Sequence, residues 1–492
     1  MKYITKIFSI MAVLLFVVSC QDFNTDLNVE NLENPNDFIL TSDPVALEAT
    51  AGTLLQNWFI SVHTYNGPGA AFATMADVST CSWGNFGMRD TSSEPRGAFN
   101  NSSSYGYAYI TNTYFNALYS VLSDSNTLAL AIQNGTEFSD PAQIEMIAKF
   151  GQALSLGYLA LVFDKVWISD ENGAVEGAEG DGASTYAEAM TFALEKLDGA
   201  IAIAQANNVS VPEAWLPNNG GNSTSLIAFM NSMGARMLVN NARNTTEKSA
   251  INWNKVSTYA NNGLTSDLEI FMDDVTWYDL IPKTYLIFPG WAQVDMRVIS
   301  MMDPSMPDYW TDDITVIAES SYGAGVDARL ATDFGYLSAQ SFRPDRGTYH
   351  FSNYRYSRYD SYITNWVENV VEFSAAENDM YKAEAMANSG NVAGAAAIIN
   401  AGTRTTRGGL ANVAANLTDI TAAIHHERLV EFSFTGMGLG FFEMRKENLL
   451  QSGTLLHFPV PGQALESIPA DGYTFGGSNG VAGEDYSNGG WR

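Results

Sequence analysis

Residues 374–407 read SAAENDMYKAEAMANSGNVAGAAAIINAGTRTTR. Apolar residues recur at helical spacing from Ser374 to Ser389, the pattern breaks at Gly390-Asn391, and it resumes to about Thr406. These 34 residues have the length of one tetratricopeptide repeat, although a generic helical hairpin would show the same pattern. Small side chains stand where two packed helices would touch: Ala383, Ala387, Ala393, Ala396 and Ala397. Either interpretation predicts two packed helices here.

Similar helix signals occur towards the N-terminus. Asp43-Pro44 and Asp140-Pro141 are helix starts, because Asp caps a first turn and Pro fits its first position. In the helix that follows Asp140-Pro141, Gly151 and Gly157 would let neighbouring helices approach closely. Helices are predicted over 43–62, 109–133, 140–163, 184–204, 224–244, 253–261 and, with a Gly-rich continuation, 418–445. The sequence therefore predicts a mainly α fold, a tetratricopeptide-like helical-repeat scaffold with a loop-rich inserted region.

Two regions lack sustained helical spacing. Residues 66–104 are rich in Gly, Pro, Ser and Asn with interspersed aromatic residues, and residues 274–362 are rich in Trp, Tyr, Pro, Asp and Gly. Long loops on a rigid scaffold usually carry function. We therefore expect the functional residues in these two regions.

The N-terminal residues have the pattern of an export signal. Lys2 and Lys6 precede or adjoin the apolar run from Ile7 to Val18, whose 12 residues are too few to span a membrane. A cysteine follows Val17-Val18-Ser19 directly, which resembles a bacterial lipoprotein box, with residues 1–19 removed and Cys20 acylated. An ordinary signal peptide with an incidental cysteine is the alternative. Residues 20–40 are polar and are predicted to be a flexible tether, so the protein would be anchored to a membrane without spanning it.

The charge of the chain excludes several partners. The 492 residues carry a formal net charge of −29, and loss of Lys2 and Lys6 with the leader makes it −31. Such a surface repels phosphate backbones and anionic lipids, and no basic cluster offsets it, so nucleic acid is excluded as a partner. If Cys20 is acylated, Cys81 has no partner in the chain and is predicted to be a small buried residue.

No motif supports an enzyme. Glu427 and Glu431 share a helix face, but a glycosidase needs two carboxyl groups at a set separation across a sugar. Beside Arg428 and Arg445, the two acids are predicted to form ion pairs that fix the helix. His425-His426 lacks the spacing of a zinc helix, and no nucleophile elbow, dinucleotide fingerprint or P-loop is present. No catalytic residue, metal or cofactor is predicted.

Short motifs in a fixed order resemble a known family. Residues 424–432, IHHERLVEF, resemble the I-x-x-E-R-x-x-E-L core of the SusD/RagB family, the outer-membrane glycan-binding lipoproteins of Bacteroidetes. Residues 441–445, FFEMR, resemble its F-D-x-R, and residues 454–461, TLLHFPVP, its terminal P-[IV]-P segment. Ala383-Glu384-Ala385, Gly390-Asn391 and Ile399-Asn400 are similar to the last helical repeat of the family. The chain departs from the pattern at residues 435–438, TGMG, and in placing arginine at 404 and 407, which indicates a divergent branch.

The resemblance implies a single SusD-like fold and a non-catalytic surface protein. Such a protein binds oligosaccharide and passes it to a partner SusC-like TonB-dependent outer-membrane transporter. It also implies lipid anchoring to the outer membrane through Cys20, facing outside. On this basis we expect a scaffold over 41–273 with a ligand loop at 66–104, an insert over 274–362, and the last repeat with the C-terminal region over 363–492. A peptide- or protein-binding lipoprotein of the same architecture and an anchored glycan-processing enzyme are the alternatives.

The two loop-rich regions contain the side chains that bind sugars. A sugar ring offers a C–H face to aromatic rings and a rim of hydroxyl groups to Asp, Asn and Arg. The candidate ligand residues are Trp83, Asn85, Arg89, Tyr105 and Tyr107 in the first region and Trp277, Tyr278, Trp291, Asp308, Tyr309 and Trp310 in the second. Any of these tryptophans could instead pack in the core, and Trp310 could anchor the insert. We expect Trp83 and Trp291 to contribute most.

Overall fold

The structure is a computed structural model that describes residues 43–177, 181–279, 291–310, 317–339, 350–468, 470–477, 487 and 489–491. The predicted leader over residues 1–19, the acylation site Cys20 and the tether over residues 20–40 lie outside the described residues, so those predictions stay untested. The described chain is mainly α, as the helical periodicity predicts.

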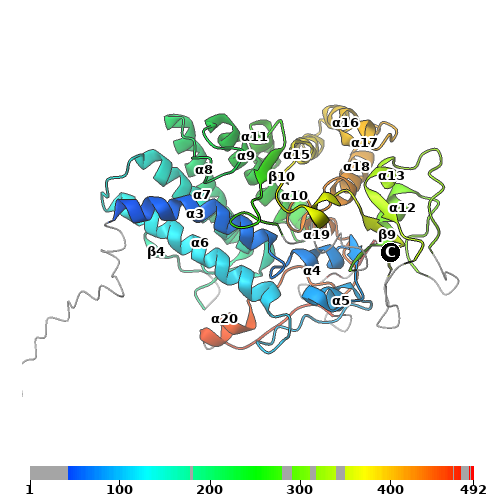
Figure 1. Ribbon diagram of the computed structural model, residues 1–492, viewed down its shortest axis with the longest axis horizontal. Helices are drawn as coiled ribbons and strands as arrows, with labels where there is room; N and C mark the ends of the chain where they lie inside the picture. The colour runs from blue at the N-terminus through cyan, green and yellow to red at the C-terminus, as the bar shows by residue number, and fades with distance from the viewer. Residues whose placement is uncertain are drawn as a thin grey trace, which may run out of the picture.

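Long helices packed in succession form the scaffold (Figure 1). The first helix, α3, packs on α6 and α7; from there each helix packs on the next, through α7, α8, α9, α11 and α15, to α16 and α18 at the opposite end. Their bounds are α3 (Pro44–His63), α6 (Tyr109–Gln133), α7 (Pro141–Val162), α8 (Tyr186–Asn207), α9 (Ser223–Asn240), α11 (Trp253–Asn261), α15 (Ala375–Asn388), α16 (Val392–Ala401) and α18 (Leu417–Val430). This succession gives the rigid frame on which the loops are placed.

Glycines set the spacing between α7 and its neighbours. A methyl group on Gly151 would lie 2.2 Å from Ser125 Oγ of α6, and one on Gly157 would lie 2.2 Å from Met237 Sδ of α9. Both distances are far inside van der Waals contact, so only glycine allows these helices to pack as closely as they do. The predicted role of Gly151 and Gly157 is confirmed.

The predicted helix starts are also confirmed. The Asp43 carboxylate accepts hydrogen bonds from the amides of Val45 and Ala46, at 3.0 and 3.3 Å, and Asp140 accepts one from the amide of Gln143 at 3.0 Å. These bonds satisfy amides that lack a partner within the helix. The helices α6 and α11 have the predicted bounds, 109–133 and 253–261.

Four predicted helices differ from the structure, and one of them, predicted over 224–244, ends at Asn240. The segment predicted over 184–204 begins with β5 (Ser184–Thr185), which pairs with β2 (Lys165–Val166) before α8 starts. The hairpin's second helix divides at Gly402 into α16 and α17 (Thr403–Thr406). The segment predicted over 418–445 contains α18 and α19 (Leu439–Lys446), separated by a turn in which Phe434 and Gly438 have φ of 66° and 72°. Positive φ cannot continue a right-handed helix, so the turn ends α18.

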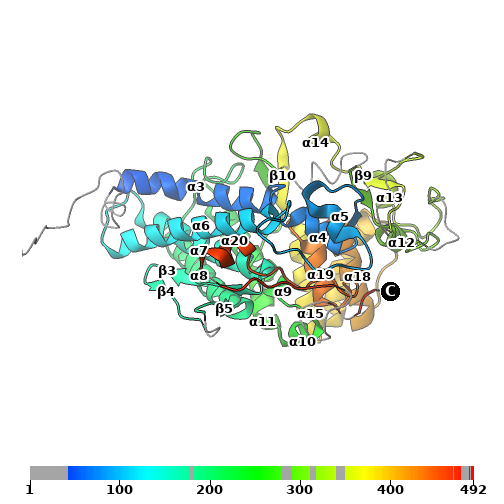
Figure 2. The same cartoon turned by 90° about the horizontal axis from the view of Figure 1, so that it is seen from below.

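Residues 66–104 are not entirely loop, which corrects the prediction. They include α4 (Gly69–Met75), the 3-10 turn η2 (Asn85–Gly87) and α5 (Met88–Ser92). The helix α4 is buried along its whole length and packs on α19 (Figure 2), with Phe72 stacked on Phe441 at a ring distance of 4.5 Å. A helix buried on all sides has no polar face, so it shows no amphipathic periodicity in the sequence.

The insert and its surroundings contain short helices and two-stranded antiparallel sheets. The ladder of β6 (Leu268–Phe271) and β10 (Asn369–Phe373) joins its two ends, and β8 (Phe334–Tyr336) pairs with β9 (Tyr354–Tyr356). A further ladder, β1 (Ser79–Thr80) with β7 (Gln293–Val294), connects the insert to residues 66–104. The remaining elements are β3 (Ser169–Asp170), β4 (Gly173–Ala174), α10 (Thr245–Ala250), α12 (Met296–Met302), α13 (Arg329–Thr332), α14 (Ser361–Thr364) and α20 (Gly462–Ser467).

Glu427 and Glu431 form buried ion pairs, as predicted, but with other partners. The Arg329 guanidinium lies 2.8 Å from each of the two carboxylates, and Arg407 lies 2.5 Å from Glu431. Arg428 instead pairs with Glu384 at 2.5 Å, because the position next to Glu427 points to another side of the helix. Arg445 donates to backbone carbonyl groups, including that of Asn240 at 2.7 Å. These paired charges hold α18 against the insert and against α15.

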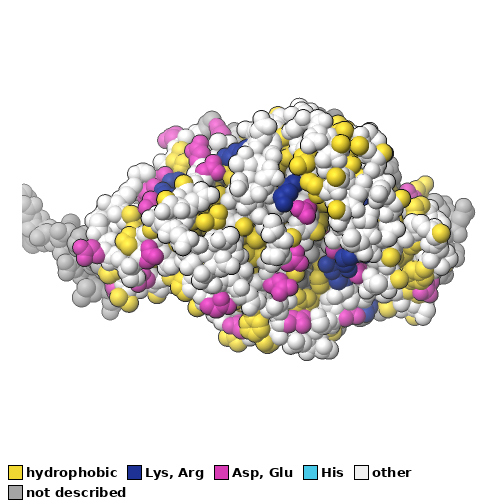
Figure 3. Space-filling model, turned by 90° about the horizontal axis from the view of Figure 1, so that it is seen from above, with side chains coloured by type: hydrophobic (Ala, Val, Ile, Leu, Met, Phe, Trp, Pro, Cys, Tyr) yellow, Lys and Arg dark blue, Asp and Glu magenta, His cyan; other side chains and the backbone are white. Residues whose placement is uncertain are grey.

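Acidic side chains outnumber basic ones on the face shown in Figure 3, in keeping with the net charge of −29. Within the described residues, no helix combines the length and the apolar character needed to cross a membrane.

Candidate functional site

The ladder of β1 and β7 brings the two loop-rich regions together. Ser79 pairs with Val294 and Thr80 with Gln293, although more than 200 residues separate them in the chain. Beyond the end of the ladder, Cys81 Sγ lies 2.8 Å from the carbonyl oxygen of Trp291 and 3.4 Å from that of Trp83. The backbones of the two favoured tryptophans therefore lie side by side.

Cys81 contacts the backbone of both regions at this junction. Its side chain is fully buried, as predicted for a cysteine without a disulfide partner. Burial raises the pKa of the thiol to about 12, so it stays neutral and serves as a hydrogen-bond donor to the loop carbonyl groups.

Seven aromatic residues gather around the junction and form what we call the aromatic cluster. Phe86 and Trp291 stack with ring centroids 6.2 Å apart and planes inclined by 23°, and Tyr65 lies 5.2 Å from Phe86. A second run joins Tyr105 to Tyr107 at 5.4 Å and Tyr107 to Tyr109 at 6.1 Å. The two runs meet at the η2 turn, where Gly84 lies against Tyr107 and Gly87 lies against Tyr105 and Tyr107. The members are Tyr65, Phe86, Tyr105, Tyr107, Tyr109 and Trp291, together with Trp83, whose backbone carbonyl contacts Cys81 at the junction; all are partly buried.

The backbone at η2 is shaped to present Phe86. Phe86 has φ 54° and ψ 28°, a left-handed conformation that is rare for a bulky residue, and Gly87 follows with φ 68°. A methyl group on Gly84 would lie 2.6 Å from the Tyr107 hydroxyl, and one on Gly87 would lie 2.5 Å from Ile110 Cδ1. The two glycines thus let the turn press against the tyrosines, and the strained residue between them is directed to Trp291.

Polar groups border the cluster. The side-chain amide of Asn85 makes no hydrogen bond to any described residue. The Arg89 side chain is 42% exposed, and its Nε lies 3.6 Å from an Asp90 carboxylate oxygen. The Tyr105 hydroxyl donates to Asp90 Oδ2 at 2.7 Å; burial and this bond raise the pKa of Tyr105. Asn85 and Arg89 therefore offer donors beside partly exposed rings.

The structure separates the other sequence candidates from the cluster. Trp277 is only 4% exposed and packs on Phe59 at a ring distance of 5.4 Å, which places it in the core, while Tyr278 beside it is partly buried. Trp310 packs on Phe351 with ring centroids 4.8 Å apart and planes tilted by 39°, and it donates its Nε1–H to the Phe351 carbonyl at 2.8 Å, so it anchors the insert.

Asp308 and Tyr309 lie beside that anchor. Tyr309 is 41% exposed, and its ring lies 6.2 Å from that of His350, whose Nε2 is 3.2 Å from Glu94 in the first region. Burial lowers the pKa of His350 to about 4, so this contact is a hydrogen bond rather than an ion pair at neutral pH. Asp308 is partly buried, and its carboxylate accepts no hydrogen bond from a described residue.

Sequence reasoning missed Tyr65, Phe86 and Tyr109. The available signal for Phe86 was its position between Gly84 and Gly87, which marks a tight turn with an aromatic residue at its tip. Tyr65 lies two residues beyond the end of α3 and Tyr109 begins α6, and at such positions sequence alone does not distinguish a core residue from a surface one.

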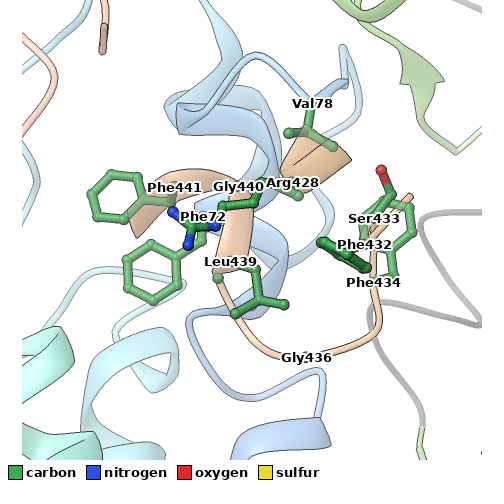
Figure 4. A pocket seen from close by; sticks show the side chains of 13 residues that line it. Phe72, Val78, Arg428, Phe432, Ser433, Phe434, Gly436, Leu439, Gly440 and Phe441 are labelled. Atoms are coloured by element: carbon green, nitrogen blue, oxygen red, sulfur yellow. The ribbon is translucent and has the colours of Figure 1, made fainter. Parts of the chain in front are cut away.

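A small cavity elsewhere is unsuitable for a ligand. Its volume is about 20 Å³, and it lies between α4 and the turn before α19, lined by Phe72, Val78, Phe432 and Leu439 (Figure 4). That volume is near the minimum for one water molecule.

Comparison with known proteins identifies the fold. No family model and no curated protein sequence matches the chain. Among solved structures, a SusD superfamily protein from Bacteroides vulgatus is similar, with a TM-score of 0.58 at 14% identity over 87% of this chain and 98% of that one. A SusD-like carbohydrate-binding protein from Bacteroides fragilis has a TM-score of 0.57 at 11% identity over 82% and 86%. A laminarin-binding SusD-like protein has a TM-score of 0.50 at 15% identity over 90% and 95%.

Proposed function

From the SusD-like fold of this chain, we propose that the protein binds oligosaccharides at its aromatic cluster. The observation that carries the proposal is the stacking of Phe86 on Trp291, which joins the two loop-rich regions into one aromatic surface. Two of the solved structures with this fold are described as carbohydrate-binding or laminarin-binding.

The cluster suits a sugar because it offers both kinds of contact that a sugar makes. Partly exposed rings cover the C–H face of a pyranose, and the free amide of Asn85 and the half-exposed guanidinium of Arg89 bond its hydroxyl groups. The contacts are few and the rings are only partly exposed, so the affinity is modest and release is fast.

The protein acts without catalysis. Its most conspicuous pair of acids, Glu427 and Glu431, is occupied by Arg329 and Arg407 and faces the interior, so neither carboxylate can flank a glycosidic bond. We propose that a bound glycan is passed on intact. The recipient we propose is a SusC-like TonB-dependent transporter in the outer membrane, with this protein anchored beside it through acylated Cys20 and facing outside.

Affinity electrophoresis tests the proposal. The full mature chain is run through gels containing neutral polysaccharides, with laminarin first because a protein of the same fold binds it, and a parallel assay measures release of reducing ends. Retarded migration without product supports a binding protein. Product formation would indicate an enzyme, and migration unchanged on every glycan would favour the peptide-binding alternative. Copurification with a transporter from outer membranes tests the proposed partner.

A further inference from the structure

A second, larger cavity lies next to the aromatic cluster, and Tyr105 belongs to both. Its volume is about 340 Å³, and it is enclosed by α5, the segment 95–100 and residues 453–455. Tyr105 is shared: its ring packs on Tyr107 of the cluster, and it also lines the cavity beside Phe99, 6.1 Å away. The volume is in the range of small-molecule sites.

Arg96 forms one wall of the cavity. Hydrogen bonds hold its side chain in place, and Asp77 balances its charge. Arg96 is 4% exposed, and its guanidinium donates to Asp77 Oδ1 at 2.6 Å, to Thr454 Oγ1 at 3.2 Å and to the Thr91 carbonyl at 2.8 Å. These bonds connect the chain's first loop-rich region to its C-terminal segment, so the wall is rigid. Because Asp77 balances its charge, Arg96 does not provide a site for an anion.

Other polar groups of the cavity have bonding capacity left. The Ser93 hydroxyl makes no hydrogen bond to any described residue, and neither does the amide nitrogen of Asn100, whose Oδ1 accepts from the Ser102 backbone at 3.1 Å. Asp90 Oδ2 accepts from Tyr105, and Asp90 Oδ1 lies 3.6 Å from Arg89 Nε and can accept a further hydrogen bond. The cavity thus offers a hydroxyl group, an amide donor and a carboxylate acceptor.

Apolar groups complete the lining. Met75, Phe99 and Leu455 line the same space and are buried against the core. A lining that combines an apolar floor with neutral donors and a carboxylate acceptor fits a ring with C–H groups on its face and hydroxyl groups at its rim.

We infer that this cavity is a second subsite, which holds one uncharged sugar ring of the glycan bound at the aromatic cluster. The inference rests on the proposed function and adds to it the chemical class of the ligand. Among the described residues lining the cavity, Arg96 is the only cation and is paired with Asp77, and Asp90 is the only anion and lies 3.6 Å from Arg89 Nε, so the lining offers no free cation to a carboxylate or sulfate. Neutral hexose chains are therefore favoured over uronic acid or sulfated chains.

The test compares two sets of variants in the full mature chain by isothermal titration. Ser93→Ala/Asn100→Ala removes polar groups of the cavity, and Trp291→Ala removes a ring of the cluster. Asn254→Ala/Ser257→Ala on α11, at the far side of the scaffold, is the matched control. The probes are laminarihexaose, or the best-retained neutral oligosaccharide of the gel screen, and oligogalacturonate of the same length.

We expect Ser93→Ala/Asn100→Ala to weaken binding of the neutral oligosaccharide about tenfold, from the loss of two hydrogen bonds, with an unfolding temperature equal to that of the control. Oligogalacturonate should bind at least tenfold more weakly than the neutral chain to the wild type. Unchanged affinity of the cavity variant, alongside weakened binding by Trp291→Ala, would overturn the subsite and leave the glycan function standing. Equal binding of oligogalacturonate would overturn the assignment of an uncharged ring. Failure of the wild type to bind any glycan would instead remove the proposed function itself.

Discussion

His63 Nε2 lies 2.6 Å from Glu372 Oε2, and both side chains are buried. The other ring nitrogen of His63, Nδ1, lies 3.0 Å from Asp279 Oδ2. The imidazole at the end of α3 therefore connects β10 with the beginning of the insert. Glu372 is also paired with Arg236 of α9 at 2.8 Å, so the histidine belongs to a buried network of charges.

This geometry predicts a loss of stability at alkaline pH. Burial alone would lower the pKa of His63, but the two carboxylates outweigh it and raise the pKa to about 9. A group whose pKa is raised on folding stabilises the fold fully below its unfolded value, near 6.5, and this contribution is lost as the pH rises through about 9. We expect the free energy of unfolding to fall by about 3 kcal/mol between pH 6 and pH 10 through this residue.

Urea unfolding of the wild type and of His63→Gln across that range measures the effect. The variant should be less stable than the wild type at pH 6, and the two should converge towards pH 10. A constant difference between them at all pH values would show that His63 is neutral in the folded protein.

Removal of one buried carboxylate should destabilise the fold. Glu427 accepts two hydrogen bonds from Arg329, each at 2.8 Å, with none of either side chain exposed. Glu427→Gln removes one of three carboxylates around the guanidinium, while Asp327 and Glu431 stay paired with it at 2.7 and 2.8 Å, so the loss of these charge-assisted hydrogen bonds should cost about 1.5 to 3 kcal/mol. The matched control, Glu195→Gln, changes an exposed acid on α8 and should cost less than about 0.5 kcal/mol. Equal effects of the two variants in chemical unfolding would contradict the structural role given to Glu427.

The tryptophans of the cluster should carry glycan binding. Trp83→Ala and Trp291→Ala are each expected to weaken binding of the best-retained glycan by about tenfold or more, because a ring that covers the sugar face is lost. Both residues are partly exposed, so the unfolding temperature should stay close to that of the wild type. Trp253→Ala, which removes a partly buried tryptophan from α11, should leave binding unchanged. Early unfolding of both cluster variants would place these rings in the core and refute the site.

Regular helices could be predicted from the sequence, because their signals are local. Asp43 and Asp140 mark helix starts through bonds to amides two or three residues away, and Gly151 and Gly157 mark close contacts through the absence of a side chain. The fold class follows from many such local signals. The buried helix α4 gave none, since all its faces are apolar or small.

The candidate site could be predicted only in part, because it depends on pairing over long distances. Two-residue strands such as β1 and β7 have no periodicity to detect, and their partners lie more than 200 residues apart. Composition placed Trp277 and Trp291 in the same loop-rich region, yet one packs on Phe59 and the other stacks on Phe86. For the same reason, the sequence did not identify Arg329 as the partner of Glu427 and Glu431, because it lies about 100 residues away in the insert.

The left-handed backbone at Phe86 and its aromatic ring should affect different quantities, the first stability and the second glycan binding. Its φ of 54° is unfavourable for any residue with a Cβ, and glycine adopts it freely. Phe86→Gly should therefore be more stable than Phe86→Ala by about 1 kcal/mol, whereas both should lose glycan affinity equally because both lack the ring. Urea unfolding and titration with the same oligosaccharide measure the two quantities. If the alanine variant proved the more stable, the left-handed conformation at this position would be excluded.

Anchoring can be tested at Cys20 independently of glycan binding. Acylation of this thiol should place the mature protein in the membrane fraction, since two or more chains hold a protein stably on a bilayer. Cys20→Ser should abolish incorporation of labelled palmitate and move the protein out of the outer-membrane fraction. The variant should bind its glycan with unchanged affinity, because all residues of the aromatic cluster lie between positions 65 and 291. Membrane retention of Cys20→Ser without label would show that something other than a lipid holds the protein there.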